Sequence, residues 1–230
     1  MKNRIGLIFI LMHLCFSGEC LHAQLTNVYG VFPTINPSYR FNDGCVAEGY
    51  YFGASPVVSL SESREIHVPQ WLMLYAEQSL SVSFGHGWSM TGSYVFQEEQ
   101  TTDRKFVAEH RLHAQIAKEY KWKSKVLKHR FRHDNRFFND HFKHRIRYQV
   151  SYKQAFNEHF YWATGQEFFF NLSRGKVKTY NENWFNALFG IKLSKHHSLE
   201  LGALNVIWHT GGNEWLNQWY FQPTWLIGLN

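Results

Sequence analysis

Alternation with a period of two residues runs through most of this chain, and it is clearest over residues 142–153. A strand places successive side chains on opposite faces, whereas a helix would mix the two sets. One face is largely apolar and aromatic: Phe142, His144, Ile146, Tyr148, Val150 and Tyr152. The other is basic and polar: Lys143, Arg145, Arg147, Gln149, Ser151 and Lys153. We therefore expect an all-β protein.

The same pattern predicts ten strands: 44–58, 70–84, 87–97, 107–119, 125–137, 142–155, 158–172, 182–193, 197–209 and 217–229. Each can supply the roughly 9–11 residues of a tilted membrane-spanning strand. The connections alternate between short and longer, as in barrels with short periplasmic turns and longer external loops. The tight "NDHF" link at 139–142 is an exception. We expect an antiparallel, up-and-down transmembrane β-barrel over residues 44–230.

The segment before this barrel, residues 24–43, fits the pattern less well. One more strand would make the count odd, whereas outer-membrane barrels of bacteria have even numbers. Pro33 and Pro37 can split the segment into two short strands, which would give twelve strands in all. Otherwise it is a periplasmic or plugging segment, and the count stays at ten.

Composition helps to choose between a membrane barrel and a soluble one. Aromatic residues make up 18% of the chain, yet the mean hydropathy is −0.39. A transmembrane barrel combines many rings with a polar interior. A periplasmic β-sandwich or calycin-like barrel also alternates, because its strands also have one apolar face. The charge on the polar faces and the rings near the strand ends favour the membrane barrel.

Residues 1–23 are expected to be a cleaved secretory signal peptide. Lys2 and Arg4 precede an apolar run that is shorter than the roughly 20 residues of a spanning helix, and Ala23 ends a plausible cleavage site. Cleavage would lower the net charge from +6 to +5 and leave Cys45 as the single cysteine, so we expect no internal disulfide. Export combined with a barrel predicts the bacterial outer membrane.

Four motifs occur in order along the predicted strands. They comprise Glu109, His110, Arg111 and Leu112; Arg130 and Arg132; Arg145, Arg147 and Tyr148; and Glu167 with Phe168. Together they resemble the domain of unknown function 2490 (DUF2490) family, over most of the chain from about residue 70. The resemblance implies an exported bacterial protein that forms an outer-membrane β-barrel. It implies no activity.

The alternation also predicts a charged belt inside the barrel. If "NDHF" closes a hairpin with Phe137 opposite Phe142, Asp134 faces Arg145 on the interior side. Arg132 then faces Arg147, and a turn at "NEH" would let Arg147 face Glu167. The predicted lumen charge network is Glu109, Arg111, Arg130, Arg132, Asp134, Arg145, Arg147 and Glu167. It can brace a narrow barrel through Arg–carboxylate pairs, or it can form an anion-attracting constriction.

Other chemistries have weaker support. The basic and aromatic residues of 129–150 resemble a nucleic-acid-binding segment, but the alternation places them on opposite faces, so no nucleic acid is expected. His129 and His133 are about 13 Å apart along one strand, too far to share a metal ion. There is no P-loop, dinucleotide fingerprint or nucleophile elbow, so we expect no cofactor and no catalytic residues.

The sequence therefore predicts a non-enzymatic outer-membrane barrel, either structural or a small pore. The alternative is an outer-membrane enzyme that acts on lipid or lipopolysaccharide. The expected partners are outer-membrane lipid, lipopolysaccharide and the barrel-assembly machinery during insertion. Small solutes or anions are possible ligands of the lumen.

Overall fold

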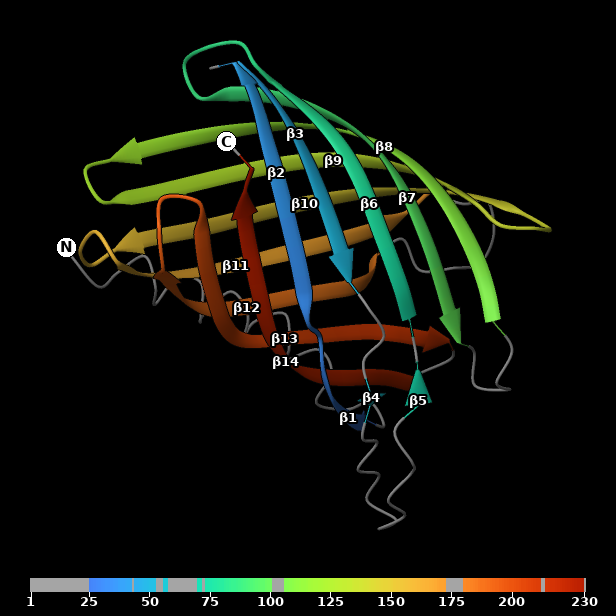
Figure 1. Cartoon of the computed structure of the whole chain (residues 1–230). Helices are drawn as coiled ribbons and strands as arrows, with labels where there is room; N and C mark the ends of the chain where they lie inside the picture. The colour runs from blue at the N-terminus through green and yellow to red at the C-terminus, as the bar shows by residue number, and fades with distance from the viewer. Residues whose placement is uncertain are drawn as a thin grey trace.

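The computed structural model describes residues 25–42, 44–52, 56–57, 70–71, 73–100, 106–172, 180–211 and 214–229. These residues form strands throughout, as Figure 1 shows, and they include no helix suited to crossing a membrane. The strands are β1 (Leu25–Val31), β2 (Thr34–Asn42), β3 (Cys45–Phe52), β4 (Pro56–Val57), β5 (Gln70–Trp71), β6 (Met73–Ser83), β7 (Trp88–Gln100), β8 (Phe106–Trp122), β9 (Lys125–Phe137), β10 (Phe142–Ala155), β11 (Phe160–Asn171), β12 (Tyr180–Lys192), β13 (His197–Gly211) and β14 (Glu214–Gly228). The predicted signal peptide lies outside the described residues.

The prediction of an all-β barrel is confirmed, and the ten expected strands correspond to β3 and β6–β14. Consecutive strands from β2 to β14 pair antiparallel, apart from the separate two-residue ladder of β4 and β5. The expected longer connection at 210–216 is short instead. Gly211 pairs with Glu214, so backbone pairing extends the last hairpin almost to its tip.

The barrel closes differently from the expected even, antiparallel arrangement. The segment 24–43 forms β1 and β2, split next to Pro33, and both pair in parallel with the same edge of β14. Eleven strands form the closed circuit, and β1 is an additional outer strand. An odd circuit needs one parallel pair, and here this pairing supplies partners to a β14 edge that would otherwise be open.

The bend between β1 and β2 is anchored inside the barrel. Phe32 is buried and makes edge contacts with the rings of Tyr220 at 5.7 Å and Trp184 at 6.4 Å, measured between centroids. Directly after it, the Thr34 hydroxyl donates a hydrogen bond to Thr224 Oγ1 at 2.6 Å. The bend therefore fills the interior beside β14. It also stabilises the parallel seam, which is the pairing of β1 and β2 with β14.

The parallel seam leads to a cross-linking prediction. Asn36 lies opposite Leu226 in the register, so cysteines at these two positions, in a Cys45→Ser background, are expected to form a disulfide. The measurement is the gain in mobility on a non-reducing gel of the folded protein. The control pairs Asn36→Cys with Gly228→Cys, two residues out of register, and should link poorly. Equal linkage in both variants would contradict the parallel register.

Each short turn has a local cause in the sequence. Gly85, His86 and Gly87 adopt positive φ angles of 89°, 50° and 76° between β6 and β7, and Lys123 adopts 47° between β8 and β9. After β10, the Asn157 side chain accepts hydrogen bonds from the backbone N–H groups of the next turn. These turns lie at one end of the barrel, the short-turn end, at the upper left of Figure 1.

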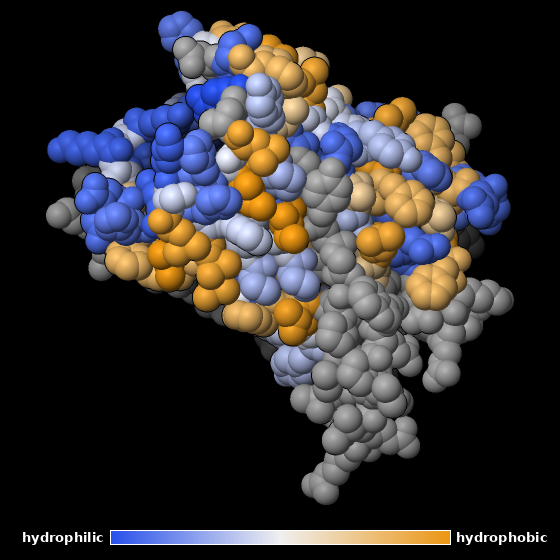
Figure 2. Space-filling model, viewed as in Figure 1, coloured by the Kyte–Doolittle hydropathy of each residue, from blue (hydrophilic) through white to orange (hydrophobic). Residues whose placement is uncertain are grey.

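The two faces of the sheet differ as the alternation predicts. Outward side chains are mostly apolar, and Figure 2 shows hydrophobic residues spread over the visible surface. Exposed rings near the short-turn end are Tyr39, Phe41, Phe84, Trp88, Tyr120, Trp122, Phe160, Phe189 and Trp225. Exposed rings near the opposite end are Phe106, Phe137 and Phe142. The interior holds an apolar cluster around Phe32, Leu204, Val206 and Tyr220, and beside it a charged network.

Candidate functional site: a charged network inside the barrel

The predicted charged network is built by alternate residues of β8, β9 and β10, together with Glu167 on β11. The β9–β10 register places Phe142 opposite Phe137, Arg145 opposite Asp134 and Arg147 opposite Arg132, as the sequence predicted. All eight predicted side chains lie on the interior side: Glu109, Arg111, Arg130, Arg132, Asp134, Arg145, Arg147 and Glu167. Their ion pairs form two neighbouring sets, one around Asp134 and Glu167 and the other around Glu109.

Asp134 is the centre of the network, and its exposed fraction is 0%. Arg132 donates from Nε to Asp134 Oδ1 at 2.5 Å. Arg145 donates from Nε and Nη2 to Asp134 Oδ2 at 3.2 and 3.1 Å. Arg147 Nη1 lies 3.7 Å from the same oxygen. The Asp134 carboxylate is therefore shared as a counter-charge by three guanidinium groups from two neighbouring strands.

Glu167 on β11 forms the second junction. Arg147 donates to it in two-point geometry, Nε to Oε1 at 2.8 Å and Nη2 to Oε2 at 2.9 Å. Arg130 donates from Nη2 to Oε1 at 2.8 Å, across the intervening strand β10. The register differs from the expected one, because Arg147 lies opposite Phe169 and Glu167 lies opposite Gln149. The long Arg147 side chain spans this two-residue offset, so the contact forms diagonally.

Glu109 on β8 forms the third junction, with a partner that the sequence prediction did not include. Arg111 donates from Nε to Glu109 Oε1 at 2.7 Å. Arg136 makes a two-point contact, Nε to Oε1 at 2.7 Å and Nη2 to Oε2 at 2.6 Å. Arg136 shares the β9 face of Arg132 and Asp134, so the alternation alone could have identified it.

Two further acids complete the network and were also missed. Glu77 on β6 accepts a hydrogen bond from Tyr75, contacts His113 Nε2 at 3.0 Å and lies 3.9 Å from Arg132 Nη1. Glu182 on β12 accepts from Arg145 Nη1 at 3.1 Å and from Trp184 Nε1 at 2.6 Å. Their strands carry no conspicuous charge pattern, and their contacts cross one or two intervening strands, so the pairing of adjacent strands alone did not reveal them.

Aromatic rings close one side of the network. The guanidinium carbons of Arg145 and Arg147 lie 4.8 and 4.4 Å from the centroid of the Phe169 ring. Trp184 packs against Phe169 at 5.3 Å between centroids and belongs to the border of the apolar interior cluster. These stacked contacts hold the arginines in place and shield their ion pairs from water.

The charges nearly balance, and most of the charged groups are shielded from water, with Arg130, Arg136, Glu77 and Glu182 the most exposed. Six arginines meet five carboxylates: Arg111, Arg130, Arg132, Arg136, Arg145 and Arg147 against Glu77, Glu109, Asp134, Glu167 and Glu182. Glu109 is 2% exposed, and Arg111 and Arg132 are each 3% exposed. An open, water-filled constriction would leave these groups wet. The arrangement therefore fits a filled interior better than an anion channel.

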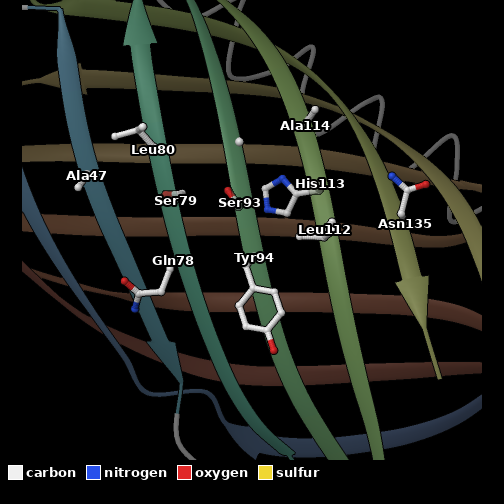
Figure 3. A pocket seen from close by; sticks show the side chains of 11 residues that line it. Ala47, Gln78, Ser79, Leu80, Ser93, Tyr94, Leu112, His113, Ala114 and Asn135 are labelled. Carbon is white, nitrogen blue, oxygen red and sulfur yellow. The ribbon is translucent and has the colours of Figure 1, made fainter. Parts of the chain in front are cut away.

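One arrangement inside the barrel invites comparison with a catalytic triad. Ser93 lies directly opposite His113 in the β7–β8 register, as Figure 3 shows. His113 in turn contacts Glu77. Within the described part of the chain, however, Ser93 Oγ and His113 Nδ1 are buried without hydrogen-bond partners. The hydrogen bond between nucleophile and base that defines a triad is therefore not formed.

The hollow drawn in Figure 3, about 620 Å³ in volume, is formed around Gly92 and belongs largely to the outward side of the sheet. Its outward-pointing lining includes Leu80, Tyr94 and Leu112. Ser93 and His113 also contribute to the lining, although both residues are buried and lie on the interior face of the sheet. Gly92 has no atom within 4 Å of the position that a Cβ would occupy, which explains the gap in the wall.

The two histidines considered for metal binding lie on the outward face. His129 Nδ1 is 2.7 Å from the Tyr148 hydroxyl, and the His133 ring stacks on that of His144 at 5.5 Å between centroids. Among the described residues there is no group of three or more His, Cys, Asp or Glu side chains that could hold a metal ion.

Comparison with known proteins identifies a family without a known activity. The family model described as "Protein of unknown function (DUF2490)" matches residues 38–217. This range contains most of the barrel and every residue of the charged network. No curated protein matches the chain.

Proposed function

Since the chain belongs to the DUF2490 family, we propose that it is a non-enzymatic β-barrel of the bacterial outer membrane whose interior is closed by the charged network. In this proposal the barrel is a structural or surface-interaction protein and does not form an open pore. The observation that carries this proposal is the nearly complete pairing and burial of six arginines with five carboxylates in the lumen.

The outward face supports the membrane location. Large apolar side chains are widely exposed on it, for example Phe41 at 61%, Phe84 at 56% and Leu80 at 50%. Soluble monomers rarely expose so much contiguous apolar surface. Exposed rings lie near both strand ends, as in the two aromatic girdles of outer-membrane barrels, and a few, such as Tyr94 and Phe131, lie between them. Outer-membrane lipid and lipopolysaccharide would then cover this face, after insertion by the barrel-assembly machinery.

The location is tested by fractionation of cells that express the full chain. We expect the protein in the outer-membrane fraction, with faster gel migration before heating than after heating. This shift is expected because a closed barrel resists detergent until its strand pairing is broken by heat. Soluble periplasmic protein, or a band whose migration does not change on heating, would overturn the proposed location.

The closed interior is tested in a planar lipid bilayer. The wild-type barrel is expected to give no steady conductance steps. The charge-balanced variant Arg147→Ser/Glu167→Ser removes two side chains that fill the lumen and is expected to introduce steps. Asp140→Asn, at an exposed turn position, is the control and should stay silent. Steady anion-selective steps from the wild-type protein would instead establish a pore.

A further inference from the structure

The hairpin between β8 and β9 carries a surface that the closed barrel does not explain. We propose that it binds the headgroup of an anionic phospholipid in the leaflet at the short-turn end. The surface, here called the lysine–aromatic hairpin, consists of Lys118, Lys121, Lys123 and Lys125 with the rings of Trp88, Tyr120 and Trp122. This inference rests on the proposed membrane location and adds a specific lipid partner.

Lys118 joins the two turns on which the surface is built. Its ammonium nitrogen contacts the backbone oxygen of His86 and lies 5.1 Å from the Trp88 ring and 5.4 Å from the Tyr120 ring. Tyr120 in turn stacks on Trp122 at 6.2 Å between centroids. The ammonium group is thus held at the edge of an exposed aromatic platform, as in side chains that anchor at a membrane interface.

The hairpin holds more positive charge than its own acid can balance. Between residues 118 and 128 it has five lysines, of which Lys128 is the last, and one acid, Glu119. Glu119 lies 3.2 Å from Lys121 and 3.9 Å from Lys128. Within the described part of the chain, Lys118, Lys123 and Lys125 form no ion pair, so the hairpin has charge to offer to an anion.

A pocket of about 370 Å³ lies within this surface. His86, Gly87, Lys118, Glu119, Tyr120, Lys121 and Trp122 line it. Gly87 keeps the two turns close, because a Cβ there would lie only 2.3 Å from the backbone oxygen of Glu119. Its amide oxygen also accepts the Glu119 N–H at 2.8 Å. The pocket is therefore a fixed feature of the short-turn end, which is hydrophilic in Figure 2.

The neighbouring surface identifies the ligand as a lipid. Moving from the hairpin toward the middle of the barrel, the outward side chains become apolar, with Met90, Ile116 and Phe131 exposed at 56%, 42% and 48%. A phospholipid places its phosphate beside the lysines and its acyl chains along this wall. A soluble phosphate or a nucleic acid would use the lysines and leave the apolar wall without a partner. Short turns of outer-membrane barrels face the periplasm, so the leaflet is the phospholipid one.

The test measures lipid retained by the purified full-length barrel in detergent, by native mass spectrometry, with phosphatidylglycerol and phosphatidylcholine as probes. We expect clear preference for phosphatidylglycerol. The variant Lys118→Gln/Lys123→Gln/Lys125→Gln should bind it about 100-fold more weakly, as expected for three lysines near an anionic surface. The matched control, Lys143→Gln/Lys192→Gln/Lys195→Gln, removes equal charge elsewhere and should bind like the wild type.

Each other outcome counts against a specific claim. Equal retention of the two lipids, or equal loss in both triple variants, overturns the headgroup site while leaving the membrane barrel intact. Displacement of phosphatidylglycerol by millimolar inorganic phosphate would show that the site takes a free anion instead of a lipid. Failure of the wild-type protein to insert into vesicles overturns the proposed function and this inference together. Single Lys118→Gln and Lys125→Gln variants replace the triple variant if it does not fold.

Discussion

Replacing Asp134 with alanine is expected to destabilise the folded barrel by about 3–5 kcal/mol, the usual cost of removing one partner from a buried ion pair. Asp134 is fully buried and receives hydrogen bonds from Arg132 and Arg145, with Arg147 close by. Without it, three guanidinium groups lose a shared counter-charge in an interior that water barely reaches. The measurement is the denaturant midpoint of the barrel refolded in lipid vesicles.

Two further variants test whether the loss of stability comes from the charged network or from the loss of any carboxylate. Asp140→Asn removes a carboxylate whose side chain is 83% exposed and should change stability by no more than about 0.5 kcal/mol. The double variant Asp134→Ala/Arg145→Ala should cost less than the two single changes added together, because the two side chains contact each other. An Asp134→Ala protein as stable as the wild type would show that the network does not brace the barrel.

Gly190→Ala is expected to destabilise the barrel by about 1–3 kcal/mol through overpacking. A Cβ at this position would lie 2.1 Å from Tyr161 Cζ and 2.2 Å from Cε2. The ring cannot easily move, because Tyr161 is 1% exposed, donates a hydrogen bond to Glu200 at 2.8 Å and has the Lys153 ammonium 3.5 Å from its centroid. The glycine is thus required by the ring that lies over it.

The same substitution should reverse its effect when the ring is removed. In a Tyr161→Ala background, Gly190→Ala is expected to be neutral or to stabilise by about 0.5–1 kcal/mol, since alanine is favoured over glycine within a strand. Gly92→Ala is the matched control, because nothing lies within 4 Å of its Cβ position. Destabilisation by Gly190→Ala of similar size with and without Tyr161 would contradict the steric explanation.

The alternation of residues was sufficient to predict the strands and their two faces, because side chains at odd and even positions of a strand point to opposite sides. The hairpin of β9 and β10 is the clearest case: one assumed pair, Phe137 with Phe142, placed Arg132, Asp134, Arg145 and Arg147 together. The Glu167 contact formed despite a register error of two residues, because an arginine side chain is long enough to reach a diagonal neighbour.

The seam shows where local pattern fails. Residues 24–43 contain prolines and few alternating residues, so their pairing could not be derived from parity. What fixes it is the edge of β14, which is formed by residues nearly 200 positions away in the chain. Local pattern also missed Glu77 and Glu182, because their partners on β8, β9 and β10 lie beyond one or two intervening strands and are not direct hairpin neighbours.

The sequence by itself determined the strands, their two faces and the identity of most charged groups inside, because these follow from alternation and hairpin turns. Only the tertiary structure decided the eleven-stranded circuit, its parallel closure and the balance of charge in the lumen. Those features depend on which distant strand edges meet and on which side chains then face each other across a closed interior. Neither is encoded in the period of any single segment.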